Sequence, residues 1–331
     1  MLCNISFGQM RPANNRASTP KGTPVVTQKR PSRRPSSLAE QSTGANISAP
    51  GQGDGTSLSE KPYEPQRLSY ATTFTDPVQQ KIIQVMEFLT AKPELLRRIR
   101  RFEAMGVPHG QPFWQQALDV MGIDVQTPEE QIAKIPRTGP LVITANHPHG
   151  LVDGMVMGEL IGRVRTDYKI LTRSLLTGIT EIDAFMIPVP FAHDPDALRK
   201  NIEMRRVAMR HLADGGVIAL FPSGVVASAD RMMGPAIERE WSAFTAKMIQ
   251  RSGAAVVPLR FTGQNSRAYQ IASRLSPTLR QGLLLYEVRH ALDKIQRPII
   301  GDPISAKEMD AWAGDPMGFM RWLREKTLTL G

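Results

Sequence analysis

The chain has only one cysteine among its 331 residues, Cys3, so it cannot form an intramolecular disulfide. A single thiol also excludes a metal site built from several cysteines. No apolar run reaches the roughly 18 residues needed to cross a bilayer, and the chain does not open with a secretory signal pattern. We therefore expect a protein of a reducing, cytoplasmic compartment that neither spans a membrane nor is secreted.

Aromatic residues make up only 6% of the chain, and in the part expected to fold they are not interleaved with basic residues. This disfavours the stacking platforms that bind single-stranded nucleic acid, so we expect no nucleic-acid partner. Lysine and arginine nevertheless outnumber aspartate and glutamate, 41 to 31, which gives a net charge of +10. Such a surface attracts anions, among them an anionic membrane surface.

Residues 1–66 are rich in small and polar residues and carry basic patches such as QKRPSRRPSS (28–37). They lack the clustered large apolar side chains that could offset the entropy lost on ordering. We predict a disordered basic tail, which either adheres to an anionic surface or is a solvated extension. Residues 67–331 are predicted to form a single domain.

A helical N-terminal part is predicted over residues 67–136. In DPVQQKIIQVMEFLTA (76–91), Asp76 and Pro77 are start signals for a helix. Apolar residues then recur at helical spacing, at Val78, Ile82, Val85, Met86 and Leu89. A third helix is predicted over QPFWQQALDVMG (111–122), ended by Gly122.

Between these two, PELLRRIRRFEAMG (93–106) predicts a basic amphipathic helix. Four arginines lie largely on one side, and the other side carries Leu95, Leu96, Ile99 and Phe102. Such a helix either docks on a core with a solvated basic face or lies on a membrane surface. We favour the membrane surface once the resemblance described below is taken into account.

Residues 137–304 alternate amphipathic stretches with short apolar runs: LVITA (141–145), YKIL (168–171), FMIPV (185–189), VIALF (217–221), AAVVPLRF (254–261), LLLYEV (283–288) and RPIIG (297–301). Continuous apolar strands are covered on both faces. The pattern predicts an α/β core with a mostly parallel or mixed sheet flanked by helices, followed by a C-terminal helix over 305–331. Sites in such sheets lie where strands end.

Two histidines and an aspartate follow the first strand of this core, in NHPHG (146–150) and at Asp153. A histidine there can act as a general base, and a carboxylate on its second nitrogen would orient it. His149 and Asp153 are four residues apart, whereas His147 and Asp153 pair only if residues 148–151 form a turn. Spacing alone leaves both pairings open, as well as the possibility that the histidines merely fill a loop.

The His-x-His spacing is also one that zinc sites use. Such a site needs further ligands at other strand ends, and the other histidines do not sit in that pattern: His109, His193, His211 and His290. We predict no metal.

A second strand ends in Phe221, Pro222, Ser223 and Gly224. Small residues there let the backbone approach a ligand, and the serine hydroxyl can donate to it. A tight strand-to-loop turn is the alternative. Arg231 follows and could meet a phosphate or carboxylate.

These motifs, in this order and together with the Val-Pro at 257–258, resemble the glycerolipid acyltransferase superfamily, which includes the 1-acyl-glycerol-3-phosphate acyltransferases. The resemblance covers roughly residues 140–304. Within it the chain is similar to a bacterial branch of acyltransferases and haemolysins, including the acyltransferase part of ornithine-lipid synthases, which carries an Asn-His-Pro block. Two departures stand out: the His-to-Asp spacing is one longer than usual, and Ser223 replaces the glutamate of Phe-Pro-Glu-Gly.

The resemblance implies that His147 is the catalytic base and Asp153 its orienting carboxylate. We expect the substrate-binding residues around the two motifs, at Asn146, His149, Gly150, Phe221, Pro222, Ser223, Gly224 and Arg231. The implied enzyme is a transferase of phospholipid biosynthesis. It moves a fatty acyl group from acyl-coenzyme A or acyl carrier protein to the hydroxyl of a lysophospholipid or related lysolipid.

No cofactor beyond the acyl donor is expected. The implied location is peripheral, on the inner, cytoplasmic face of an anionic membrane. Two alternatives stay open: a lipid or thioester hydrolase in which water uses the same base, and a catalytically inactive membrane-binding relative, which the serine at 223 makes conceivable.

Overall fold

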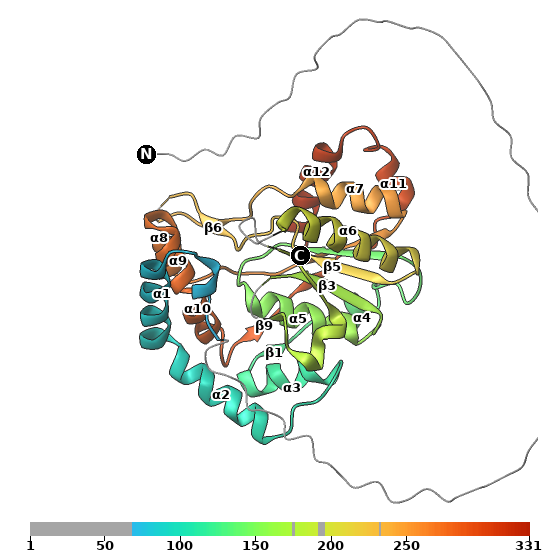
Figure 1. The fold of residues 1–331 in the computed structure, drawn as a ribbon. Helices are drawn as coiled ribbons and strands as arrows, with labels where there is room; N and C mark the ends of the chain where they lie inside the picture. The colour runs from blue at the N-terminus through green and yellow to red at the C-terminus, as the bar shows by residue number, and fades with distance from the viewer. Residues whose placement is uncertain (1–67, 174–175, 191–195, 232) are drawn as a thin grey trace, which may run out of the picture. The chain divides into compact units, whose positions relative to one another are not determined.

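The computed structural model describes residues 68–173, 176–190, 196–231 and 233–331, and Figure 1 traces their fold. The predicted disordered tail, residues 1–66, lies outside the described residues, as does His193. The described residues belong to one compact unit.

A six-stranded sheet occupies the centre, in the order β10-β8-β2-β5-β3-β4. Its strands are β2 (Leu141–Ala145), β3 (Tyr168–Thr172), β4 (Met186–Pro188), β5 (Val217–Leu220), β8 (Ala255–Arg260) and β10 (Ile299–Ile300). β10 runs antiparallel to β8, and the other neighbours are parallel. The predicted α/β fold with a mixed sheet flanked by helices is confirmed.

Alternate residues of each central strand face two separate apolar layers. In β2, Leu141 and Ile143 pack into one layer and Val142 into the other. The first layer is closed by α3 (Pro112–Met121) and α5 (Leu151–Gly162), the second by α6 (Ala197–Ala213), α7 (Ala243–Ser252) and α12 (Pro316–Leu328). Burial on both faces is why the strand sequences are continuously apolar.

Strands β2 and β5 are neighbours, but the chain leaves them on opposite sides of the sheet. After β2 it passes through α5 on the first face to reach β3; after β5 it passes through α7 on the second face to reach β8. Parallel sheets hold ligands in the crevice that such a divergence opens at the carboxyl ends of the strands. The two sequence motifs follow β2 and β5.

The run LLLYEV, expected among the strands, is helical and belongs to α10 (Leu284–His290). Its buried apolar residues Leu285 and Val288 are three apart, a helical spacing, and they pack with Leu95 of the basic helix α2 (Lys92–Ala104). An apolar run this short does not distinguish a strand from a buried helix, so the prediction was wrong here.

The first two helices differ from expectation in which faces they bury. α1 (Pro77–Thr90) begins where predicted, with the Asp76 side chain accepting from the Val78 backbone N–H. Its buried residues are Ile83 and Glu87, however. Most of the predicted apolar stripe is exposed, by 43% to 75% at Val78, Ile82, Val85 and Leu89, and Met86 is half-buried.

The basic helix is α2 (Lys92–Ala104), and its apolar side faces the protein. Leu95 is buried, and Leu96, Ile99 and Phe102 pack against the apolar cores. The expectation that this apolar side contacts lipid is therefore wrong, because the fold uses it. Its arginines Arg97, Arg100 and Arg101 are exposed.

Smaller elements complete the fold. α3 ends at Gly122, which has φ +69° as the predicted stop requires, and the predicted C-terminal helix is two helices. The remaining elements are η1 (Ala71–Thr73), β1 (Asp124–Val125), α4 (Glu129–Ile132), η3 (Thr180–Phe185), β6 (Ser228–Ala229), β7 (Ala236–Ile237), α8 (Arg267–Leu275), α9 (Pro277–Gly282), β9 (Ile295–Gln296) and α11 (Ala306–Asp310). Among the described helices, none is long and apolar enough to cross a membrane.

Candidate active site

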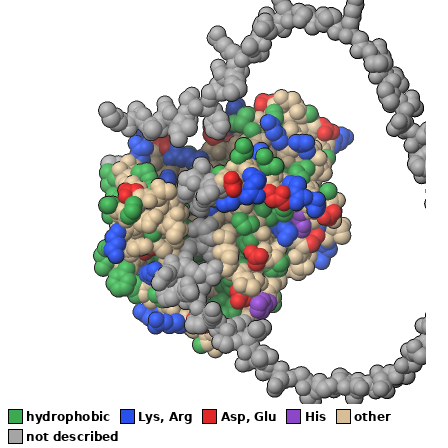
Figure 2. Space-filling view, in the orientation of Figure 1, with side chains coloured by type: hydrophobic (Ala, Val, Ile, Leu, Met, Phe, Trp, Pro, Cys, Tyr) green, Lys and Arg blue, Asp and Glu red, His purple; other side chains and the backbone are tan. Residues whose placement is uncertain are grey.

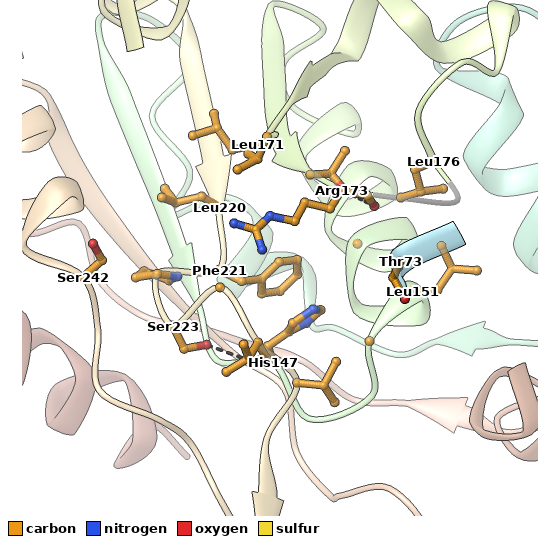
Figure 3. A pocket seen from close by; sticks show the side chains of 18 of the residues that line it. Thr73, His147, Leu151, Leu171, Arg173, Leu176, Leu220, Phe221, Ser223 and Ser242 are labelled. Atoms are coloured by element: carbon orange, nitrogen blue, oxygen red, sulfur yellow. Dashed lines mark hydrogen bonds between the residues drawn. The ribbon is translucent and has the colours of Figure 1, made fainter. Parts of the chain in front are cut away.

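A cavity of about 660 Å³ opens at the carboxyl ends of β2, β3 and β5 (Figure 3). Six of the ten predicted site residues line it: His147, Gly150, Phe221, Pro222, Ser223 and Gly224. The crevice between β2 and β5 therefore brings together two motifs that lie more than seventy residues apart.

One ring stack and three hydrogen bonds hold His147 in place. Its ring stacks on Phe221 with centroids 3.8 Å apart, and its Nδ1 lies 3.0 Å from Oδ2 of Asp153. Its backbone N–H donates to the Glu238 carboxylate, and its carbonyl accepts from the Ala227 N–H. The ring is 17% exposed and faces the cavity (Figure 3).

Asp153 lies in the first turn of α5 and is 1% exposed. Its carboxylate accepts four hydrogen bonds, from the two histidine rings and from the backbone N–H groups of His149 and Gly150. Burial alone would raise its pKa, but the nearby His149 and the hydrogen bonds from both rings outweigh burial and lower the pKa to about 2. The carboxylate is ionised at neutral pH.

An ionised carboxylate can only accept hydrogen bonds, so the neutral His147 ring must carry its proton on Nδ1. Nε2 is then the unprotonated nitrogen and can take a proton from a substrate in the cavity. Asp153 also stabilises the imidazolium that this transfer forms. The arrangement is that of a general base, His147, with its orienting carboxylate, Asp153.

His149 makes the second pairing that the spacing allowed, because its Nδ1 lies 3.0 Å from the other oxygen of Asp153. Burial lowers its pKa, but Asp153 and Glu287 together outweigh burial and raise it above the ordinary histidine value. Its side chain is not part of the cavity wall. Both pairings exist, and only His147 faces the cavity.

Two other predicted substrate-binding residues lie outside the cavity. The Asn146 amide donates to the Phe261 carbonyl at 2.9 Å and accepts from the Phe261 N–H at 2.8 Å, so it ties the end of β2 to the end of β8. Arg231 is exposed after β6.

The second motif forms a tight turn on the cavity wall. Gly224 has φ +67°, a left-handed conformation that favours glycine. The Ser223 hydroxyl donates to the Val225 carbonyl at 3.0 Å (Figure 3). The motif is therefore a tight turn that also lines the cavity, and its contact with a ligand stays a prediction.

Three arginines on the cavity wall were not predicted: Arg173, Arg205 and Arg280. Arg173 comes directly after β3, and Figure 3 shows its side chain reaching over the cavity near Leu220 and Phe221. Its place at a strand end was a usable signal. Arg205 and Arg280 lie within helices, where nothing in the sequence marks them.

An apolar wall lies beside these cations, formed by Leu171, Val189, Met204, Leu220 and Phe244. The cavity thus offers a base, positive charge and apolar surface. Within the described residues, no group of three or more His, Cys, Asp or Glu side chains is placed to hold a metal ion.

Comparison with known proteins gives two similarities. No protein-family model matches the chain. A stretch of 146 residues, 44% of this chain, is 25% identical to a protein named lyso-glycine lipid O-acyltransferase from Phocaeicola vulgatus. The match spans 50% of that relative, so the chain corresponds to about half its length.

A solved structure is also similar, the 1-acyl-sn-glycerophosphate (LPA) acyltransferase PlsC from Thermotoga maritima. The superposition has a TM-score of 0.40 at 12% identity and covers 77% of this chain and 98% of that chain. A likeness of this size identifies no reaction.

Proposed function

We propose that the protein transfers a fatty acyl group from a thioester donor, acyl-coenzyme A or acyl carrier protein, to the hydroxyl of a lysolipid. The observation that carries this proposal is the His147 ring, which faces the cavity while an ionised, buried Asp153 holds its Nδ1. The curated relative supports it, because its name denotes O-acylation of a lysolipid.

In the proposed step, Nε2 of His147 takes the proton of the acceptor hydroxyl as the oxygen attacks the thioester carbonyl. An ester C–O bond forms, the C–S bond breaks, and the leaving thiolate takes the proton back from the imidazolium. The products are the acylated lipid and a free thiol, and no covalent acyl-enzyme is needed. Proton removal by a positioned base is worth about 10²–10⁴-fold in rate.

The cavity walls suit these substrates. The apolar wall can take an acyl chain, and Arg173, Arg205 and Arg280 can meet the anionic groups of the donor or of a lysolipid head group. Gly150, Ser223 and Gly224 also line the cavity, and we propose that they contact the substrate.

Acyl transfer by the purified protein tests the proposal. Labelled acyl-coenzyme A and acyl carrier protein are offered with lysophosphatidic acid, lyso-glycine lipid and lyso-ornithine lipid. We expect a diacyl product with at least one acceptor, and a loss of about 10²–10⁴-fold in His147→Ala. His211→Ala, which removes a histidine outside the cavity, is the control. Release of free fatty acid without an acceptor would instead indicate a hydrolase, and no reaction with any pair would indicate an inactive relative.

We further propose that the protein binds an anionic membrane surface through α1. Val78, Ile82, Val85 and Leu89 follow the 4-3-4 spacing of one helical stripe, and all are exposed, with exposed Phe88 beside them. We call these five residues the α1 face. Such a contiguous exposed apolar surface is typical of contact with lipid or protein.

Charge favours lipid as the partner. In Figure 2, apolar side chains and Lys or Arg side chains lie side by side at the left edge, over α1 and α2. The exposed cations Arg97, Arg100 and Arg101 belong to α2, the next helix in the chain. Thr73 and Phe74, just before α1, line the cavity, so a lipid surface at the α1 face would lie near its entrance. The inner, cytoplasmic face of the membrane stays a prediction.

Vesicle binding tests this contact. We expect the protein to bind vesicles that contain phosphatidylglycerol more tightly than vesicles of phosphatidylcholine alone. Leu89→Ser should weaken binding roughly tenfold, since about 1.5 kcal/mol of apolar burial is lost. Met317→Ser, at an exposed apolar residue of α12, is the matched control. Equal binding by wild type and Leu89→Ser would refute the α1 face as the contact.

A further inference from the structure

The Asp153 carboxylate serves two imidazoles at once. Its Oδ2 lies 3.0 Å from Nδ1 of His147, and its Oδ1 lies 3.0 Å from Nδ1 of His149. The rings are 17% and 14% exposed. Two groups that can each become cationic therefore share one negative charge, in a place where water screens charges poorly.

His149 is positioned to act on its neighbours rather than on a substrate. Its ring is not part of the cavity wall, and its Nε2 faces the loop at Gly263, where an added Cβ would lie 3.2 Å away. Besides the base on the same loop, the charged groups near it are Asp153 on α5, Glu287 on α10 and Lys294 after α10. Burial lowers the pKa of His149, but the two carboxylates outweigh burial and the lysine, and the pKa is raised.

We propose that His149 is a positioning residue that acts on His147 through the shared carboxylate and keeps that base unprotonated at lower pH than Asp153 alone would allow. This inference rests on the proposed role of His147 as the base. It assigns to the second histidine of the motif a part in the chemistry without contact to the substrate.

The two imidazoles interact with the same carboxylate. When His149 is protonated, its positive charge offsets part of the negative charge of Asp153 and repels a second proton on His147. Without that charge, the whole of Asp153 would favour the imidazolium form of His147, which cannot accept a proton from an acceptor hydroxyl.

Two substitutions separate the charge of His149 from its hydrogen bond. His149→Asn places a neutral N–H group near the position of Nδ1, whereas His149→Ala removes both charge and donor. We expect the acidic limb of the profile of kcat/KM against pH to move upward by roughly one pH unit in both variants. The plateau rate should fall less in His149→Asn than in His149→Ala, because asparagine keeps a hydrogen-bond donor toward Asp153. His211→Asn, whose ring contacts the Asp167 carbonyl, should leave the limb in place.

A titration that needs no substrate makes the test independent of the reaction. With ¹³C-labelled histidine, the ring signal of His147, assigned by its loss in His147→Gln, should reach its midpoint at higher pH in His149→Asn than in wild type. An unchanged midpoint and an unchanged acidic limb would reduce His149 to a structural contact and overturn the inference. If no donor and acceptor react but the midpoint still moves, the proposed function fails while the coupling of the two rings stands.

Discussion

Replacing Asp153 by asparagine removes the negative charge that both histidine rings share, at nearly constant side-chain volume. The carboxylate accepts four hydrogen bonds through two oxygens, whereas an asparagine offers one oxygen and turns an NH₂ group toward the remaining donors. Stability and activity should therefore both fall.

The size of the stability loss follows from the pKa of Asp153, which drops from 3.8 to about 2 on folding. A drop of this size corresponds to roughly 2 kcal/mol. Because the folded pKa is the lower one, this contribution is present above about pH 4 and is lost as the pH falls through about 2. We expect Asp153→Asn to lose roughly 2–3 kcal/mol near neutral pH, and the difference from wild type to shrink below about pH 4.

Urea unfolding of both proteins at several pH values measures this difference. Asp310→Asn, at an exposed carboxylate of α11, is the control and should stay within about 0.5 kcal/mol of wild type. Acyl transfer by Asp153→Asn should fall by about 10²–10⁴-fold, since the base loses its orientation and its stabilised imidazolium. A stability difference under about 0.5 kcal/mol near pH 7, or one that does not depend on pH, would refute the charge-based account of this site.

Two further substitutions test the frame around the site. Gly158→Ala places a Cβ 2.8 Å from a ring carbon of the fully buried Trp114, so we expect a loss of about 1–3 kcal/mol in urea unfolding, whereas Gly314→Ala, with nothing within 4 Å, should be neutral. Asn146→Ala leaves the buried backbone N–H and C=O of Phe261 without partners, at about 1–3 kcal/mol each. It should lower activity more than Gly158→Ala does, because it releases the end of β2 next to the base; similar activity in the two variants would contradict that role.

The predictions that the structure confirms depend on residues that are close together in the sequence. Apolar runs form strands because the sheet buries both faces, and α1 begins at Pro77 because the side chain of Asp76 caps its start. The placement of NHPHG and FPSG at strand ends also follows from adjacent residues. The likeness to acyltransferases gains support from the lysolipid O-acyltransferase relative, whereas the narrower Asn-His-Pro branch stays a prediction.

The predictions that were wrong concern which face of a helix packs against the rest of the protein. The exposed stripe of α1 has the same spacing as a buried one, and only the packing of Ile83 and Glu87 shows that the helix turns its other side inward. In the same way, LLLYEV is helical because α10 packs against α2. Sequence periodicity identifies an apolar face but not what covers it.

The choice between the two histidines also depends partly on the sequence and partly on tertiary packing. The sequence by itself determined that two imidazoles and a carboxylate follow a buried strand, because their spacing along the chain is local. The tertiary structure decided that both imidazoles bind Asp153 and that only His147 faces the cavity. That decision depends on Phe221, which stacks on the ring, and on Glu238, ninety-one residues away, which holds the backbone. Such partners meet only when the sheet brings distant strand ends together, and no spacing along the chain encodes their distance in space.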